Sequence, residues 1–266
     1  MQGDGQLRKM KANIGIDTVE YQLMLGENCI PMNEFIGKPL RFKFLNEIRC
    51  VDCGKTTKKS FGEGFCYNCF TDSANNSPCI IRPELCEGHL GKGRDLEWEK
   101  NNHVQEHCVY LALSSEVKVG VTRSTQIPTR WIDQGASSAI VLARVPYRQL
   151  AGVIEVALKE YLTDKTSWQK MLKNEIGDFD LVEYKWRMAE LLPRDLQDYI
   201  DDSEEIIQLN YPVLEYPQKV TSVGFEKTPE IEGVLRGIKG QYLIFDNNRV
   251  MNVRSHSGYV VSLQAL

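Results

Sequence analysis

The feature that most constrains this chain is a pair of Cys-x2-Cys sequences in the stretch RCVDCGKTTKKSFGEGFCYNCF. The first pair is Cys50 and Cys53, and the second, after twelve intervening residues, is Cys66 and Cys69. A Cys-x2-Cys turn directs two thiolates at one ion, and two such turns complete a tetrahedral shell without an open position for substrate. The spacing therefore predicts a structural zinc site of the zinc-ribbon kind. The alternative is four reduced thiols buried as small hydrophobic side chains.

The residues around these cysteines cannot form a core of their own. Residues 49–107 are rich in Cys, Gly and Asn and poor in aliphatic side chains, so burial cannot offset the loss of chain entropy there. The segment needs a metal or a host domain, and structural zinc would contribute on the order of 10 kcal/mol to its folding.

The cellular compartment of the protein decides whether its eight cysteines form disulfides or bind metal. The N-terminus has no apolar core of signal-peptide length, and no run approaches the roughly 20 apolar residues of a membrane span. We therefore expect a cytoplasmic protein that makes no membrane contact. In a reducing cytosol, cysteines favour metal over disulfides. Cys29 and Cys108 have no evident partner and are expected to be buried thiols.

Downstream of the first four cysteines, three of the four histidines fall within nineteen residues. Cys86 and His89 form a knuckle-like pair, and His103 and His107 would share a face if they lay on one helix. We predict a second zinc site from Cys86, His89, His103 and His107, with Cys79 as a reserve ligand. The alternative is that these histidines are surface or capping residues.

The hydrophobic pattern predicts a mixed α+β fold in four parts. These are an N-terminal β region over 1–48, a zinc-binding region over 49–107, a central domain over 108–192, and an acidic linker with a C-terminal β region over 193–266. Glycine spacing in the last part suggests a small barrel formed with the N-terminal strands. The alternative is an extension of the central sheet.

The central domain shows the order β-β-α-β-α. VYLALSS and VKVGVTRS are predicted strands, RWIDQG lies in a predicted helix, AIVLARVP is a third strand, and YRQLAGVIEVALKEYL has helical spacing. LVEYKWRMAELLP is a further helix, and YLIF and RVMNVR are predicted to form a hairpin around the turn DNN.

Charge is segregated along the chain. The net charge of −4 and the pI near 5.7 argue against non-specific coating of nucleic acid. Nevertheless, residues 38–59 carry seven basic residues, which predicts a local basic face, and residues 195–205 hold six acids and no base. The acidic segment is a candidate contact for a basic protein partner.

Within the central domain, Tyr110, Lys118-Val119-Gly120, Arg130 and Glu155 occur in the order of the GIY-YIG nuclease superfamily, which this region resembles. The resemblance implies the β-β-α-β-α core and hydrolysis of a phosphodiester. It places Tyr110 near the attacking water, Arg130 on the phosphate and Glu155 on Mg²⁺ or Mn²⁺. Lys118 stands where the second tyrosine usually lies, and Gly120 matches the final glycine of the second motif.

The residues themselves leave other interpretations open. Tyr110 also fits the core of a strand, Arg130 a surface helix charge and Glu155 a solvated helix edge. Trp131 can stack on a base or anchor a helix to the sheet. The leading hypothesis is a metal-dependent endonuclease acting on DNA or RNA. The alternatives are a non-catalytic zinc-ribbon protein that binds nucleic acid, and a zinc-scaffolded protein-interaction module.

Over nearly all of its length the chain also resembles an uncharacterised bacterial family, the domain of unknown function two-seven-nine-seven. The motifs that carry this resemblance are CVDCGK, FCYNCF, PELC, HCVYLA, KVGVTR, RWIDQGA, DKTSW and GIKGQYLIFD. The resemblance implies a zinc-containing protein with a GIY-YIG-like region and gives no activity. The family has a cysteine before its Arg-Asp dipeptide, where this chain has Gly93, and this departure changes the ligands open to a second site.

Overall fold

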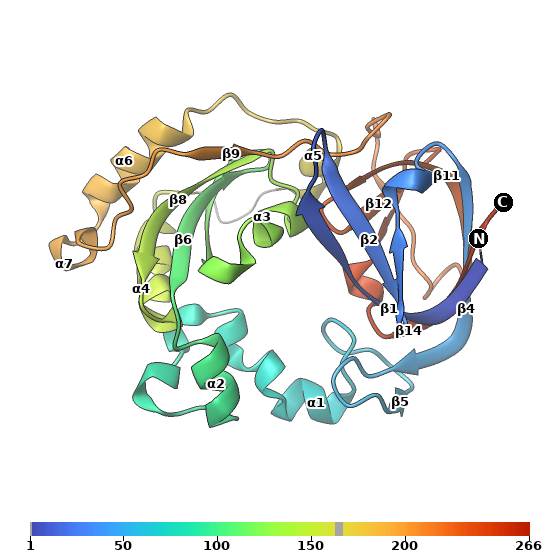
Figure 1. Cartoon of the computed structure of the whole chain (residues 1–266), viewed down its shortest axis with the longest axis horizontal. Coiled ribbons are helices and arrows are strands. Elements are labelled where there is room, and N and C mark those ends of the chain that lie inside the picture. Colours follow the sequence, from blue (N-terminus) through green and yellow to red (C-terminus); the bar gives the residue numbers. More distant parts are fainter. Residues whose placement is uncertain (1, 163–166) are drawn as a thin grey trace. The chain divides into compact units, whose positions relative to one another are not determined.

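The computed structural model describes residues 2–162 and 167–266, which fold into two compact units (Figure 1). Unit 1 comprises Met1–Thr71, Ile132–Gly135 and Leu209–Leu266, and unit 2 comprises Asp72–Trp131 and Ala136–Gln208. Sheets and helices occur together, which confirms the mixed α+β class. The predicted four-part division stays a prediction. In the described ranges, every helix is too short or too polar to cross a membrane.

Unit 1 is built on a ten-stranded sheet that joins the two ends of the chain. Its path runs β10-β13-β12-β11-β4-β14-β1-β2-β3, with β5 paired to β4. The blue N-terminal and red C-terminal strands lie side by side in Figure 1, because β1 and β14 pair antiparallel. The strands are β1 (Gln2–Ile14), β2 (Val19–Leu25), β3 (Asn28–Pro31), β4 (Pro39–Arg49), β5 (Thr56–Thr57), β10 (Thr221–Ser222), β11 (Glu230–Lys239), β12 (Tyr242–Phe245), β13 (Arg249–Asn252) and β14 (Tyr259–Ala265).

The expected packing of N-terminal and C-terminal strands is confirmed, but the small barrel is not. Over the described residues the sheet follows an open path from β10 to β3, and these end strands do not pair. The glycines that suggested barrel corners serve close approaches instead. A Cβ on Gly237 would lie 2.6 Å from Val213 Cα, and one on Gly233 would lie 2.6 Å from the Arg249 guanidinium.

The predicted C-terminal hairpin is confirmed. β12 and β13 pair antiparallel, with Tyr242 opposite Asn252. Asn247 and Asn248 in the turn have φ of 56° and 61°. Asparagine tolerates this left-handed conformation, and two such residues give a turn whose twist matches that of the strands.

A buried polar contact repairs an irregularity in β1. The register between β1 and β2 shifts between Arg8 and Lys11, so Met10 loses its place in the ladder. The side-chain amide of Gln241 bonds both backbone groups of Met10 instead: Met10 N donates to Gln241 Oε1 at 2.9 Å, and Gln241 Nε2 donates to Met10 O at 3.1 Å. Gln241 Nε2 also donates to Asp133 Oδ1 at 2.8 Å, and Lys9 forms an ion pair with Asp133.

We predict that Gln241→Leu destabilises unit 1 by about 2 to 3 kcal/mol, because both backbone groups of Met10 and the Asp133 carboxylate each lose a buried partner. Denaturant unfolding measures this change. The matched control is Gln264→Leu, at a half-buried position on β14, which should change stability by less than about 0.5 kcal/mol. Equal effects of the two substitutions would refute the role of Gln241.

Unit 2 contains a four-stranded antiparallel sheet in the order β7-β6-β8-β9. The predicted order β-β-α-β-α is confirmed as β6-β7-α3-β8-α4. Its elements are α2 (Leu96–Asn102), β6 (His107–Leu113), β7 (Val117–Arg123), α3 (Thr129–Asp133, whose last two residues belong to unit 1), β8 (Ser138–Val145), α4 (Arg148–Leu158), α5 (Trp168–Leu172), α6 (Leu181–Leu191), α7 (Arg194–Gln197) and β9 (Ile206–Gln208); α1 (Tyr67–Asp72) lies where unit 1 ends.

The core of unit 2 lies on one face of this sheet. Val109, Leu111 and Leu113 alternate along β6 and pack with residues of α4 and α6, such as Ile154 and Met188. The predicted α6 is confirmed, and Asp180 caps it by accepting from Val182 N and Glu183 N. Ser167 caps α5 by accepting from Lys170 N, and residues 163–166 lie outside the described residues.

Candidate metal centres and a basic cluster

The four predicted zinc-ribbon cysteines come together in unit 1. The sulfur atoms of Cys50, Cys53, Cys66 and Cys69 all lie within 4.8 Å of one another. Cys53 Sγ and Cys66 Sγ are 3.8 Å apart. Zinc–sulfur bonds of about 2.3 Å in a tetrahedron set an S···S edge of about 3.8 Å. The donor set therefore fits zinc, and this cluster could bind it.

The backbone of the first turn prepares its sulfur for a metal. Gly54 N donates to Cys50 O at 3.0 Å, and Gly54 has a φ of 73°, which closes the knuckle without strain. Burial raises the pKa of the Cys50 thiol, but N–H groups of Cys53, Cys66 and Asp52 that donate to its sulfur lower the pKa to about 7. The thiolate form that a metal needs is thus favoured.

Gly64 lets the second turn approach the first. Gly64 O accepts from Val51 N at 2.9 Å. A Cβ on Gly64 would lie 2.6 Å from Val51 Cγ1 and 2.7 Å from Ser257 O. A larger residue would push apart the segments that hold the cysteines.

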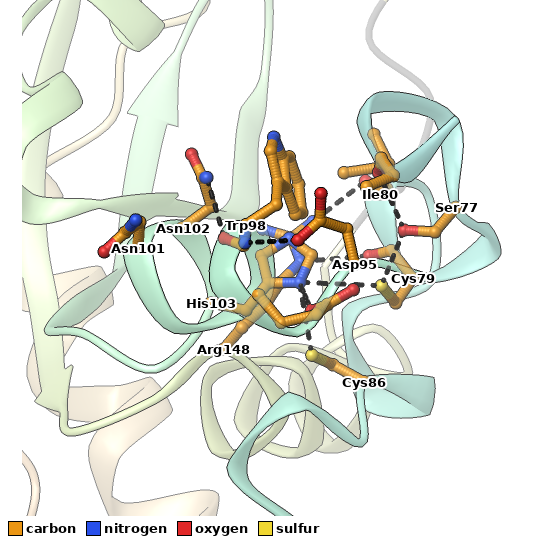
Figure 2. Close-up of polar contacts among 12 residues, drawn as sticks. Ser77, Cys79, Ile80, Cys86, Asp95, Trp98, Asn101, Asn102, His103 and Arg148 are labelled. Atoms are coloured by element: carbon orange, nitrogen blue, oxygen red, sulfur yellow. Dashed lines mark hydrogen bonds and ion pairs between the residues drawn. The ribbon is translucent and has the colours of Figure 1, made fainter. Parts of the chain in front are cut away.

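A second group of ligands lies in unit 2, where Cys79, Cys86 and His103 converge with all ligand atoms within 4.8 Å (Figure 2). His103 Nδ1 is 3.8 Å from Cys79 Sγ and 3.5 Å from Cys86 Sγ. Zinc–sulfur and zinc–nitrogen bonds in a tetrahedron place S and N about 3.5 Å apart. All three side chains are buried, and this group could also bind zinc. The hydrogen bond with Cys86 lowers the pKa of the Cys79 thiol to about 4.

The structure thus keeps Cys86 and His103 of the predicted set and adds the reserve ligand Cys79, while His89 and His107 lie outside this group of ligand atoms. His103 and His107 do not share a helical face, because α2 ends at Asn102 and β6 begins at His107.

The two histidines of the predicted set that lie outside this group, His89 and His107, have other contacts. His89 stacks on Tyr147, with ring centroids 4.4 Å apart. His107 Nδ1 bonds Gln105 O at 2.8 Å, and burial lowers the pKa of His107 to about 4. The buried His89 Nδ1 and His107 Nε2 find no hydrogen-bond partner among the described residues.

The two conspicuous residues of the first strands, Tyr110 and Gly120, are direct partners in the β6–β7 ladder. A Cβ on Gly120 would lie 2.6 Å from the Tyr110 hydroxyl oxygen, so glycine is what lets the tyrosine ring lie across β7. Tyr110 is fully buried and contacts Trp131 edge-to-face at 5.9 Å. Trp131, at 1% exposure, anchors α3 to this face.

Lys118 points to that same face, within range of the charge of Arg130. Lys118 pairs with Ala112, two residues from Tyr110, so Lys118 and Tyr110 point to one side of the sheet. Burial, and then the nearby charge of Arg130, lower the pKa of Lys118 to about 8. Among residues 2–162 and 167–266, neither Lys118 nor Arg130 forms an ion pair with a carboxylate.

Arg148, a residue outside every motif of the sequence, is a third cation near this cluster. It lies at the start of α4 and donates to Cys79 O at 3.0 Å and Ile80 O at 2.9 Å. Burial lowers the pKa of Arg148, as does the charge of Arg130, while Glu155 raises it. Arg148 therefore connects the second ligand group electrostatically with Arg130. The hydrophobic pattern of the sequence does not single out Arg148, because it is the first residue of its helix.

Glu155 is placed differently from the other three candidate catalytic residues. It lies on α4, whose apolar residues pack against the Val109–Leu111 face rather than the face of Tyr110. Its carboxylate is 3.6 Å from Lys159 Nζ. Burial raises the pKa of Glu155, against the lowering effect of Lys159 and Arg148. Tyr110, Lys118 and Arg130 therefore belong to one group. Glu155 is connected with that group through Arg148, whose pKa both Glu155 and Arg130 affect.

Part of the charge in the predicted acidic and basic segments has partners within the protein. Asp201 accepts from Arg144 Nε at 2.5 Å, and Glu204 accepts from Trp186 Nε1 at 2.6 Å. In the basic segment, Arg41 pairs with Glu232 at 2.7 Å and Arg49 with Glu47 at 2.7 Å. A protein partner for residues 195–205 stays a prediction.

The fold and the four-cysteine group define a mixed α+β protein with a candidate metal centre. A family model described as "Protein of unknown function (DUF2797)" matches residues 37–261, and the chain belongs to this family, as the motifs predicted. No curated protein and no solved structure matches the chain. The GIY-YIG likeness of the central region stays a prediction.

We predict that Cys53→Ser removes one equivalent of zinc per chain, because three thiolates hold the ion far less tightly than four. Elemental analysis of the purified protein measures the zinc content. Cys29→Ser is the control. The expected burial of Cys29 is wrong, whereas that of Cys108 is confirmed; the Cys29 thiol is exposed, bonds Gln22 Oε1 and belongs to neither ligand group. Unchanged zinc in Cys53→Ser would show that the four cysteines are simple thiols.

Proposed function

We propose that this chain is a zinc-stabilised nucleic-acid-processing protein in which Lys118 and Arg130 hold a backbone phosphate. The observation that carries the proposal is that these two half-buried cations of unit 2 lie within range of each other's charge, without a carboxylate partner among the described residues. Like charges held together away from water cost free energy. A bound phosphate anion would relieve that cost, and a guanidinium suits it by its planar, bidentate geometry.

Neighbouring residues support the same proposal. Tyr110 and Trp131 fix the strand and helix that carry the two cations. The zinc sites would serve as scaffold, because closed thiolate shells leave no position for substrate. DNA and RNA both offer the phosphate that this cluster fits, and the binding assay below separates them.

We predict that Arg130→Ala weakens binding of labelled single-stranded or double-stranded DNA or RNA by about 10-fold and lowers the slope of log affinity against log salt by about 1, as the loss of one phosphate contact requires. Fluorescence anisotropy at several salt concentrations measures both quantities.

Arg187→Ala is the matched control for this measurement, because Arg187 is exposed on α6 of the same unit and lies over the Tyr184 ring. It should leave affinity and slope unchanged. Equal weakening by both variants would mean that binding is non-specific, and no binding of any of the four nucleic acids at low salt would refute the proposal.

A second candidate function, phosphodiester hydrolysis, is favoured by the lowered pKa of Lys118, about 8. About a tenth of such an amine is neutral at pH 7 and can accept a proton. In this step a water oxygen would bond to phosphorus, its proton would pass to Lys118 Nζ, and the ester P–O bond would break with protonation of the leaving oxygen by solvent. A Mg²⁺ or Mn²⁺ ion held by Glu155 would neutralise phosphate charge from the side of Arg148, the cation whose pKa both Glu155 and Arg130 affect.

For this second candidate we predict that cleavage increases as pH rises through about 8, because the base is the neutral amine, which forms above the pKa of Lys118. Lys118→Arg should abolish cleavage at every pH but keep binding, since arginine stays protonated. Gel-based cleavage assays with magnesium or EDTA measure the rate.

Glu155→Gln should remove the metal-dependent part of cleavage, whereas Glu190→Gln, at an exposed position on α6, should not. Absence of cleavage in the unaltered protein, with binding retained, would eliminate hydrolysis and leave the binding function.

A further inference from the structure

A fourth candidate ligand, Glu99, lies beside the Cys79, Cys86 and His103 group, although neither of its carboxylate oxygens is within 4.8 Å of all three ligand atoms. Glu99 Oε2 is 2.5 Å from His103 Nδ1, the same ring nitrogen that faces both sulfur atoms. Glu99 and His103 are four residues apart: Glu99 lies on α2, and His103 is the residue at which the helix ends. Figure 2 shows the imidazole of His103 directed towards Cys79 and Cys86.

The choice of nitrogen decides the role of the carboxylate. A glutamate that merely orients a metal-bound histidine bonds the ring nitrogen that the metal does not use. Here the carboxylate bonds Nδ1, the atom on the side of the sulfurs, so Glu99 and the two thiolates approach the same ring nitrogen. A metal there would replace the proton shared between Glu99 and His103.

Burial gives an independent reason to assign a cation. Glu99 and His103 have side chains only 4% and 3% exposed. A carboxylate so removed from water requires strong compensation, which a divalent cation supplies. Two glycines make room for it: a Cβ on Gly93 would lie 2.7 Å from Glu99 Oε1, and one on Gly88 would lie 3.0 Å from Oε2.

We propose that Cys79, Cys86, Glu99 and His103 form a second, closed zinc site in which Glu99 is the fourth ligand. Two sulfurs, one nitrogen and one carboxylate oxygen match the ligands that tetrahedral zinc accepts. The site joins two short turns, η3 (Pro78–Ile80) and η4 (Pro83–Leu85), to α2. Arg148 then ties Cys79 to α4 through the backbone oxygens of Cys79 and Ile80. The proposal is independent of any nucleic-acid function.

The test measures zinc alone, by elemental analysis and by competition with a chromophoric chelator, on the full chain. The unaltered protein should hold two zinc ions. Glu99→Gln should weaken one of them by more than the roughly 10- to 100-fold that loss of a residue merely orienting His103 would cost. Glu97→Gln, at an exposed glutamate on the same helix, should hold both. His89→Ala should also keep both; if it loses one instead, His89 is the fourth ligand and the proposal fails.

A compensating variant covers the case in which Glu99→Gln folds poorly. Since a Cβ at position 93 reaches the Glu99 carboxylate, the double variant Gly93→Cys with Glu99→Ala places a thiol in the same space. It should restore the second zinc. After cobalt substitution it should also show a stronger thiolate-to-cobalt absorption band than the unaltered protein. Wild-type zinc affinity in Glu99→Gln, or no change of the cobalt band in the double variant, would overturn the assignment.

Discussion

Convergence of cysteine sulfurs and one histidine nitrogen into two ligand groups is the constraint on which the segment between residues 50 and 103 depends. This stretch contains the two-residue strand β5, the short helices α1 and α2 and a series of 3₁₀ turns. Its few buried residues include the ligands Cys50, Cys79 and Cys86 themselves. Where apolar burial is this small, cross-links to an ion can replace a core, because one ion fixes four chain positions at once.

Buried polar and charged side chains have different roles in the two units. In unit 1, Gln241 and Asp133 restore the hydrogen bonds that an irregular strand gives up, so their role is structural. In unit 2, Lys118 and Arg130 are held together without such compensation among the described residues. Uncompensated charge beside a rigid sheet is a common property of binding and catalytic sites, and this contrast is the reason for proposing that the phosphate-binding residues lie in unit 2.

The β6–β7 pair shows how far a motif can be explained by packing before chemistry is invoked. Gly120 is required because the Tyr110 ring covers it, and Tyr110 is fully buried. Both residues would be needed in a protein without any activity. The residues whose environment packing does not explain are Lys118 and Arg130, and a functional claim about this region therefore depends on them.

Local patterns in the sequence determined much of this protein: the four-cysteine group, the β-β-α-β-α order, α6 and the hairpin at Asn247 and Asn248. Each is set by residues close together in the chain, through turn geometry or periodic burial. Only the tertiary structure decided which of Cys79, His89 and His107 joins Cys86 and His103. It also decided that Glu99 and Arg148 lie beside that group, that the large sheet stays open, and that the apolar side of α4, the helix that carries Glu155, packs on the face opposite Lys118. These outcomes depend on where a helix ends and on contacts between distant segments, which no local spacing encodes.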